Sequence, residues 1–131
     1  MTARRGATDL AGVLLVDKPQ GLTSHDVLLA VRRATGERRI GHAGTLDPLA
    51  TGLLIVLVGV ATRLERYLVG HDKSYRARIS FGVATDTLDA EGAVTETAPV
   101  PPGTLTDETA RRLLAATLGP QDQDPPAYSA I

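Results

Sequence analysis

One short segment gathers the residues of this chain that are best suited to chemistry. Gly41–Leu53 reads GHAGTLDPLATGL and holds one histidine (His42), one carboxylate (Asp47), one proline and three glycines. The glycines tolerate backbone angles, and a close approach of another molecule, that a Cβ blocks. Pro48 fixes its own φ and moves Asp47 away from helical geometry. This backbone control indicates a loop that holds one carboxylate against a bulky substrate, although Asp-Pro near glycine is also ordinary turn sequence.

Positive charge is concentrated just before this segment, where four arginines occur within eight residues: Arg32, Arg33, Arg38 and Arg39. Beside a glycine-rich loop, they are candidates for contacts with the phosphate groups of a polyanion. The alternative for Arg32 and Arg33 is charge matching at the C-terminal end of a helix. That alternative does not explain Arg38 and Arg39.

The elements that must position these residues are predicted from hydrophobic periodicity. Residues 12–17 and 53–58 are short apolar runs typical of buried strands, and the second run predicts a central strand covered on both faces. Between them, Thr23 or Ser24 caps a helix that Gly36 ends.

Downstream, residues 73–81 alternate apolar and polar side chains strictly, which predicts the clearest strand in the chain. Tyr75 lies at its start, and by pattern alone it is a residue at the edge of the core. The other expected elements are a short helix at 62–68, an acidic turn at 82–92, a short strand at 93–97 and a helix at 107–117 with Ala110, Leu113 and Leu114 inward.

Composition limits the class of protein. The chain has 131 residues, of which 43% are hydrophobic and only 3% aromatic, so one domain or part of one with an aliphatic core is expected. The absence of cysteine excludes disulfide scaffolds and thiolate metal sites, and it suits a reducing cytoplasm. The longest apolar run, residues 52–61, is too short to cross a bilayer.

Charge is unevenly distributed along the chain. Residues 1–80 contain 12 Lys and Arg against 7 Asp and Glu, whereas residues 81–131 contain 2 against 8. The basic first part indicates contact with a polyanion. The alternative is a dipolar protein whose charged faces are simply solvated.

Several motifs occur in a characteristic order: GVLLVDKP at 12–19 with GLTSHD at 21–26, GHAGTLDPLATG at 41–52, DKSYRA at 72–77, TDT at 85–87 with DAEG at 89–92, and PPAYSAI at 125–131. Together they resemble the motifs of the bacterial TruB-type pseudouridine synthases. The resemblance implies an α+β fold, in which helices flank a mixed, largely antiparallel central sheet, the pseudouridine synthase fold in incomplete form.

The same resemblance implies a reaction, the isomerisation of uridine 55 in the T-loop of tRNA to pseudouridine. Asp47 matches the family's catalytic aspartate, which acts as a nucleophile or as a base. His42 matches the histidine that fills the gap left by the flipped base, and Tyr75 matches the tyrosine that stacks on the uracil. Lys18 and Pro19 are expected to shape the loop that supports the site. The T-arm stem-loop of tRNA is the expected partner; no metal, other cofactor, membrane or obligatory protein partner is expected, and the expected location is the cytoplasm.

The resemblance also predicts the domain organisation. Residues 1–11 are expected to be a disordered leader, and residues 12–131 to be the N-terminal portion of the catalytic domain, without its C-terminal part and an RNA-binding domain. Two alternatives remain open at this point. One is a non-catalytic module that binds RNA or assists its folding, and the other is a guide-RNA-dependent pseudouridine synthase.

Overall fold

The computed structural model describes residues 8–122, and the chain divides between Tyr75 and Arg76 into two units. Residues 1–7 of the expected leader and the motif at 125–131 lie outside the described residues. The first unit contains β1 (Gly12–Lys18), α1 (Ser24–Thr35), β2 (Ile40–His42), β3 (Gly52–Val58), the 3₁₀-helix η1 (Gly59–Leu64) and α2 (Glu65–Leu68). The second contains β4 (Val83–Thr85), β5 (Val94–Thr97) and α3 (Asp107–Ala115).

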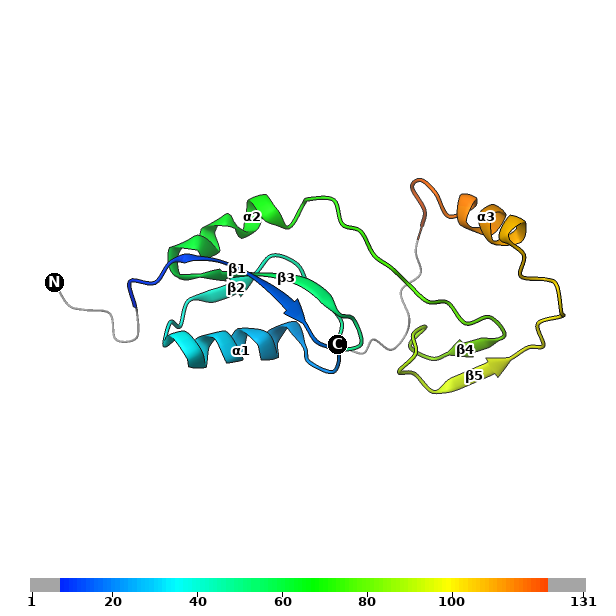
Figure 1. Cartoon of the computed structure of the whole chain (residues 1–131), viewed down its shortest axis with the longest axis horizontal. Helices are drawn as coiled ribbons and strands as arrows, with labels where there is room; N and C mark the ends of the chain where they lie inside the picture. Colours follow the sequence, from blue (N-terminus) through cyan, green and yellow to red (C-terminus); the bar gives the residue numbers. More distant parts are fainter. Residues whose placement is uncertain (1–7, 123–131) are drawn as a thin grey trace. The chain divides into compact units, whose positions relative to one another are not determined.

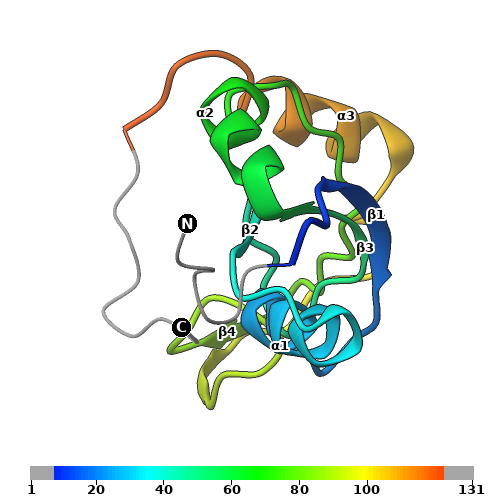
Figure 2. The same cartoon turned by 90° about the vertical axis from the view of Figure 1, so that its left-hand side faces the viewer.

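The first unit is built on a three-stranded sheet with the order β1-β3-β2, in which both strand pairs are antiparallel. Helix α1 lies along one face of this sheet, and η1 and α2 lie along the other (Figures 1 and 2). The register places Lys18 opposite Gly52 and His42 opposite Val56. Strand β3 therefore pairs with the end of β1 and with His42, where the segment that carries Asp47 begins, and that segment ends at Gly52 of β3 itself.

The core of this unit lies between α1 and β3. Val27 and Leu28 of α1 pack against Leu54 and Val56 of β3, and none of the four side chains is more than 6% exposed. The expected cover on both faces of β3 is wrong at Leu53, which is 62% exposed. The apolar run predicted the strand, but its first residues extend past the helices that cover the rest.

Helix α1 begins and ends at the capping residues that the sequence predicts. The Thr23 hydroxyl accepts a hydrogen bond from the Asp26 backbone, and the Asp26 carboxylate accepts one from the Thr23 backbone, a reciprocal cap. Hydrogen bonds from Thr23 lower the pKa of Asp26 below its ordinary value. Gly36 ends the helix at φ 70°, and its N–H bonds to the Arg32 carbonyl.

The predicted strand at residues 73–81 is wrong. These residues form no strand, and Tyr75, Ile79 and Phe81 are 71%, 66% and 48% exposed. Alternating side chains favour an extended backbone, but a strand also needs a neighbour to complete its hydrogen bonds. Within residues 8–122, the paired strands are β1, β2 and β3 in one sheet and β4 and β5 in another, and none of them pairs with this segment.

The second unit contains the β4–β5 hairpin and helix α3. The acidic turn expected at 82–92 is confirmed only after Thr85, because Val83–Thr85 forms strand β4, and the short strand expected at 93–97 is β5. Thr106 caps α3 by accepting a hydrogen bond from the Thr109 backbone, as predicted. The expectation that α3 turns Leu113 and Leu114 inward is wrong, because they are 45% and 59% exposed. Periodicity predicts an apolar stripe on a helix, but the stripe is buried only where another element packs on it.

The fold class is confirmed as α+β, with helices flanking antiparallel sheets. The short helix expected at 62–68 begins earlier, as the 3₁₀-turn η1, and becomes α-helical at Glu65. Within residues 8–122, no helix has both the length and the apolar character to cross a membrane.

Candidate active site

The segment between β2 and β3 carries Asp47 on a loop of defined conformation. Gly44 and Gly52 adopt φ values of 121° and 116°, in the region that favours glycine. Pro48 and Leu49 form a turn, and the Ala50 N–H bonds to the Asp47 carbonyl at 3.0 Å. The prediction of special backbone angles holds for these two glycines. It is wrong for Gly41, which has an ordinary φ inside β2 and room for a Cβ.

Lys18 fastens one side of this loop. It is fully buried at the end of β1, and its Nζ donates to the carbonyls of Leu22 at 2.7 Å, Pro19 at 3.0 Å and Pro48 at 3.4 Å. The Gly21 N–H donates to the same Pro48 carbonyl at 2.8 Å. The expectation that Lys18 shapes the supporting loop is confirmed, and these bonds tie the residue after Asp47 to the turn that follows β1.

Ser24 fastens the other side. It is the first residue of α1 and is 3% exposed. Its Oγ accepts a hydrogen bond from the Leu46 N–H at 2.9 Å and donates one to the Leu46 carbonyl at 3.1 Å. Sequence reasoning considered Ser24 only as a helix cap and missed this role.

Asp47 thus lies between two residues whose backbones are held by buried polar side chains. The Asp47 side chain itself is exposed, and among residues 8–122 its carboxylate has no hydrogen-bond partner. The turn-capping alternative for Asp47 therefore has no support among these residues. A fixed loop that presents an open carboxylate suits nucleophilic attack or proton abstraction on a substrate brought to it.

His42 is the last residue of β2 and is half-buried. It lies opposite Val56, and its Nδ1 is enclosed without a hydrogen-bond partner within the described part of the chain. The ordinary expectation for a lone loop histidine, a polar group on the surface, does not describe this ring. One edge of the imidazole faces the protein interior.

Within the described residues, no hydrogen bond joins the Tyr75 side chain to this loop. Tyr75 is exposed in the extended segment that follows α2. Lys73 from the same motif does approach the loop, because its Cε lies 3.7 Å from the position that a Cβ on Gly44 would occupy. The Lys73 Nζ donates to the carbonyls of Val69 and His71 at 2.8 and 3.2 Å.

The four arginines fall into two pairs. Arg32 and Arg33 lie in the last turn of α1, as the charge-matching alternative predicts, and the Arg32 Nε is buried without a partner among residues 8–122. Arg38 and Arg39 are exposed in the connection from α1 to β2. The Arg39 Nε donates to the Thr62 Oγ1 at 2.8 Å.

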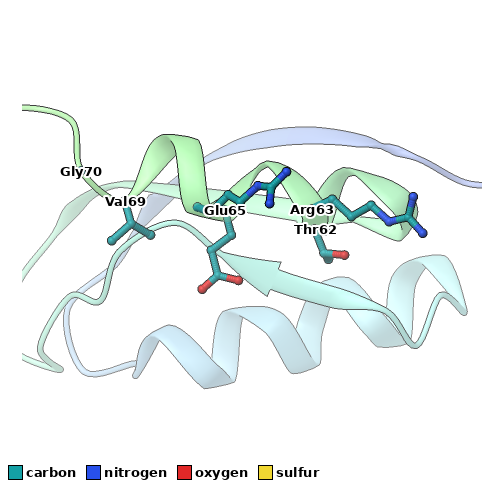
Figure 3. Close-up of a pocket in the computed structure, with 6 residues that line it drawn as sticks. Thr62, Arg63, Glu65, Val69 and Gly70 are labelled. Atoms are coloured by element: carbon teal, nitrogen blue, oxygen red, sulfur yellow. The ribbon is translucent and has the colours of Figure 1, made fainter.

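An open pocket lies along η1 and α2, where Figure 3 shows Thr62 and Arg63 on one side and Val69 and Gly70 on the other. Its lining residues are Thr62, Arg63, Glu65, Arg66, Val69 and Gly70. Arg66 also stacks on the Tyr67 ring, with its guanidinium carbon 4.7 Å from the ring centre. Sequence reasoning missed Arg63 and Arg66, although their three-residue spacing on a short helix was a signal for a shared basic face.

The described residues form no candidate metal-binding site. Within residues 8–122, no three His, Asp or Glu side chains come together in a way that suits a metal ion. The expectation that no cofactor is needed stays a prediction.

Comparison with known proteins identifies the family. The model of the TruB family pseudouridylate synthases, N-terminal domain, matches residues 32–131. The chain belongs to this family. The match includes the loop of Asp47 and confirms the resemblance drawn from the motifs.

Individual relatives agree with the family match. The chain is 53% identical over 123 residues to the tRNA pseudouridine synthase B of Opitutus terrae, covering 94% of this chain and 50% of the relative. It is 54% identical over 119 residues to the protein of that name from Deinococcus deserti, covering 91% of this chain and 38% of the relative. A third, from Mycobacterium sp. (strain KMS), is 51% identical over 126 residues, with 96% and 42% covered. The chain thus spans half or less of the length of these relatives.

Proposed function

We propose that this chain acts in the isomerisation of uridine 55 in the T-loop of tRNA to pseudouridine, with Asp47 as the catalytic residue. Family membership and relatives named tRNA pseudouridine synthase B support the reaction class. The observation that carries the role of Asp47 is its position between Leu46 and Pro48, both held by buried side chains, while its own carboxylate stays open. Such preorganisation lowers the cost of orienting a catalytic group.

The reaction needs a carboxylate but no cofactor. The bond between N1 of uracil and C1′ of ribose breaks, and a bond between C5 and C1′ forms. The hydrogen on C5 leaves as a proton, and N1 gains one, so the atoms balance. Asp47 attacks the sugar as a nucleophile or removes a sugar proton as a base, and an exposed carboxylate on a fixed loop suits either role.

Asp47 reaches the sugar only if the uridine leaves the base stack. We assign His42 to the gap that the base leaves, because its ring is half-buried at the end of β2, next to the loop. We assign Tyr75 to stacking on the flipped uracil, a role that its exposed ring permits.

RNA binding is assigned to the basic residues of the first unit. Arg39 and Arg63 are exposed, and Thr62, the neighbour of Arg63 in the pocket, accepts the hydrogen bond from Arg39. Phosphate groups of the T-arm stem are the ligands that two guanidinium groups suit. We place the reaction in the cytoplasm, with tRNA as the substrate and no protein partner required.

Mapping of the product tests this function. The chain is incubated with a T-arm stem-loop RNA without any guide RNA, and pseudouridine is located by carbodiimide labelling and primer extension. We expect modification at position 55 alone, and none in an RNA with cytidine at that position. Modification without a guide refutes guide dependence. RNA binding without modification would refute catalysis by this chain and favour the non-catalytic RNA-binding module.

A further inference from the structure

Glu37 is a buried carboxylate that the proposed reaction does not use. It follows the C-terminal cap of α1, and its side chain is 2% exposed. One carboxylate oxygen, Oε2, accepts hydrogen bonds from the Thr8 N–H at 2.9 Å and the Thr8 hydroxyl at 2.8 Å. The other, Oε1, accepts one from the Arg39 N–H at 2.8 Å. Glu37 therefore joins the segment before β1 to the connection that carries Arg38 and Arg39.

These bonds help to fix Arg39 at several atoms. Its N–H is held by Glu37, its carbonyl accepts from the Gly59 N–H at 2.8 Å, and its Nε donates to the Thr62 hydroxyl at 2.8 Å. Thr62 is held in turn, because its hydroxyl donates to the Gly59 carbonyl at 2.9 Å. The terminal amino groups of Arg39 have no partner within the described residues and lie on an exposed side chain. A guanidinium held at Nε with its terminal groups open is oriented for an external anion.

The bonding of Glu37 differs from that of an ordinary ion pair. Its partners are backbone N–H groups and one hydroxyl, and no cation pairs with it among residues 8–122. The hydrogen bond from the Arg39 backbone, followed by those from Thr8, lowers the pKa of Glu37. By charge alone, a carboxylate next to Arg38 and Arg39 opposes the binding of a phosphate. Any favourable effect of Glu37 on RNA binding must therefore come from geometry.

We propose that Glu37 is a positioning residue for RNA binding, which holds the Arg39 backbone against Thr8 and so sets the point from which Arg39 meets a backbone phosphate. The inference rests on the proposed RNA-binding function. It gives Thr8 a part in RNA binding without contact to RNA, because Thr8 supplies two of the three hydrogen bonds that the carboxylate accepts from residues 8–122.

A double-mutant cycle on the full chain tests the proposal. The dissociation constant for a T-arm stem-loop RNA is measured at fixed salt for the parent, Glu37→Ala, Arg39→Ala and the double variant. Arg39→Ala keeps the backbone N–H that Glu37 binds, and it removes the guanidinium together with its hydrogen bond to Thr62. We expect Arg39→Ala to weaken binding roughly five- to tenfold, the scale of one hydrogen bond made by an exposed side chain. We expect Glu37→Ala to weaken binding severalfold in the parent but not in the Arg39→Ala background.

The sign of the effect separates geometry from charge. Removal of a negative charge near the RNA tightens binding if only charge matters, and Asp9→Asn, which removes an exposed carboxylate next to Thr8 in the same unit, serves as the charge control. Thermal unfolding of each variant establishes that the measured population is folded. Thr8→Val keeps the backbone bond to Glu37 but removes the hydroxyl, which donates to Glu37 and accepts from the Leu10 N–H. It provides a milder variant and is expected to show a smaller loss with the same dependence on Arg39.

Three results would overturn the proposal: tighter binding by Glu37→Ala, an equal loss in the Arg39→Ala background, or no effect of Arg39→Ala. In each of them the parent still binds, so the proposed RNA-binding function survives. Failure of the parent chain to bind the RNA at low salt would instead refute the proposed function, and the role of Glu37 with it.

Discussion

Replacement of Ser24 by alanine isolates the contribution of loop anchoring to the reaction. The change removes both hydrogen bonds to Leu46 and leaves its partly buried N–H without a partner. The expected loss of unfolding free energy is about 1–3 kcal/mol, the usual cost of an unsatisfied buried group. Because Leu46 directly precedes Asp47, we also expect the single-turnover rate of isomerisation to fall roughly ten- to a hundredfold, as misplacement of a catalytic group does.

The adjacent residue provides a matched control. Thr23→Ala removes the N-cap of the same helix, with an expected cost of about 1 kcal/mol, but its hydroxyl bonds only to Asp26 among the described residues. Both variants are assayed by urea unfolding and by single-turnover conversion of T-arm RNA at saturating RNA. We expect a similar loss of stability and a loss of rate only in Ser24→Ala. Equal rates in the two variants would refute the idea that Ser24 positions Asp47.

Three further perturbations test the first unit. Gly59→Ala is expected to cost more than about 2 kcal/mol, because Gly59 has φ 61° and a Cβ there collides with the Leu10 carbonyl; urea midpoints should show no comparable loss for Gly12→Ala, where a Cβ meets nothing within 4 Å. The lowered pKa of Glu37 means that its stabilising effect is complete above its ordinary value of 4.5 and is lost as the pH falls through the lower folded value. Acid unfolding of Glu37→Gln should therefore show a flatter pH dependence than that of the parent, and an unchanged slope would contradict the assigned bonds. Lys18→Met is expected to cost about 3 kcal/mol, since it removes the buried Nζ that donates to the carbonyls of Pro19 and Leu22; a denaturant midpoint equal to that of the parent would show that these bonds contribute nothing.

Local signals in the sequence predicted local structure well. The extent of α1 follows from its capping residues and from Gly36, and the strands β1 and β3 follow from apolar runs. Each of these signals acts within a few residues of the chain. The predicted burial of β1 is wrong, because Leu14 and Leu15 are 41% and 71% exposed. Residues 73–81 alternate apolar and polar side chains but form no strand. An alternating pattern predicts an extended backbone, but it does not predict whether a partner strand is present.

The hydrogen bonds that hold the loop of Asp47 could not be predicted from the sequence. The motif proposes Asp47 and His42 as candidate site residues, but it does not show which residues hold the loop. The contacts that hold it join residues 22 and 30 positions apart, Ser24 to Leu46 and Lys18 to Pro48. Glu37 was missed for the same reason, since Thr8 lies 29 positions away. A single sequence carries no signal for such pairs, because a buried serine, lysine or glutamate reads as a surface residue until its partner is known.

The most direct test of the role of Asp47 is the release of tritium from uridine labelled at C5 in a T-arm stem-loop RNA. The parent chain and Asp47→Asn are compared at RNA concentrations that saturate both, with Glu96→Gln as a control for charge. The proposed role predicts release by the parent and by Glu96→Gln and none by Asp47→Asn, with RNA binding retained in all three. Release by Asp47→Asn at the parent rate would contradict the assignment of Asp47 as the catalytic residue.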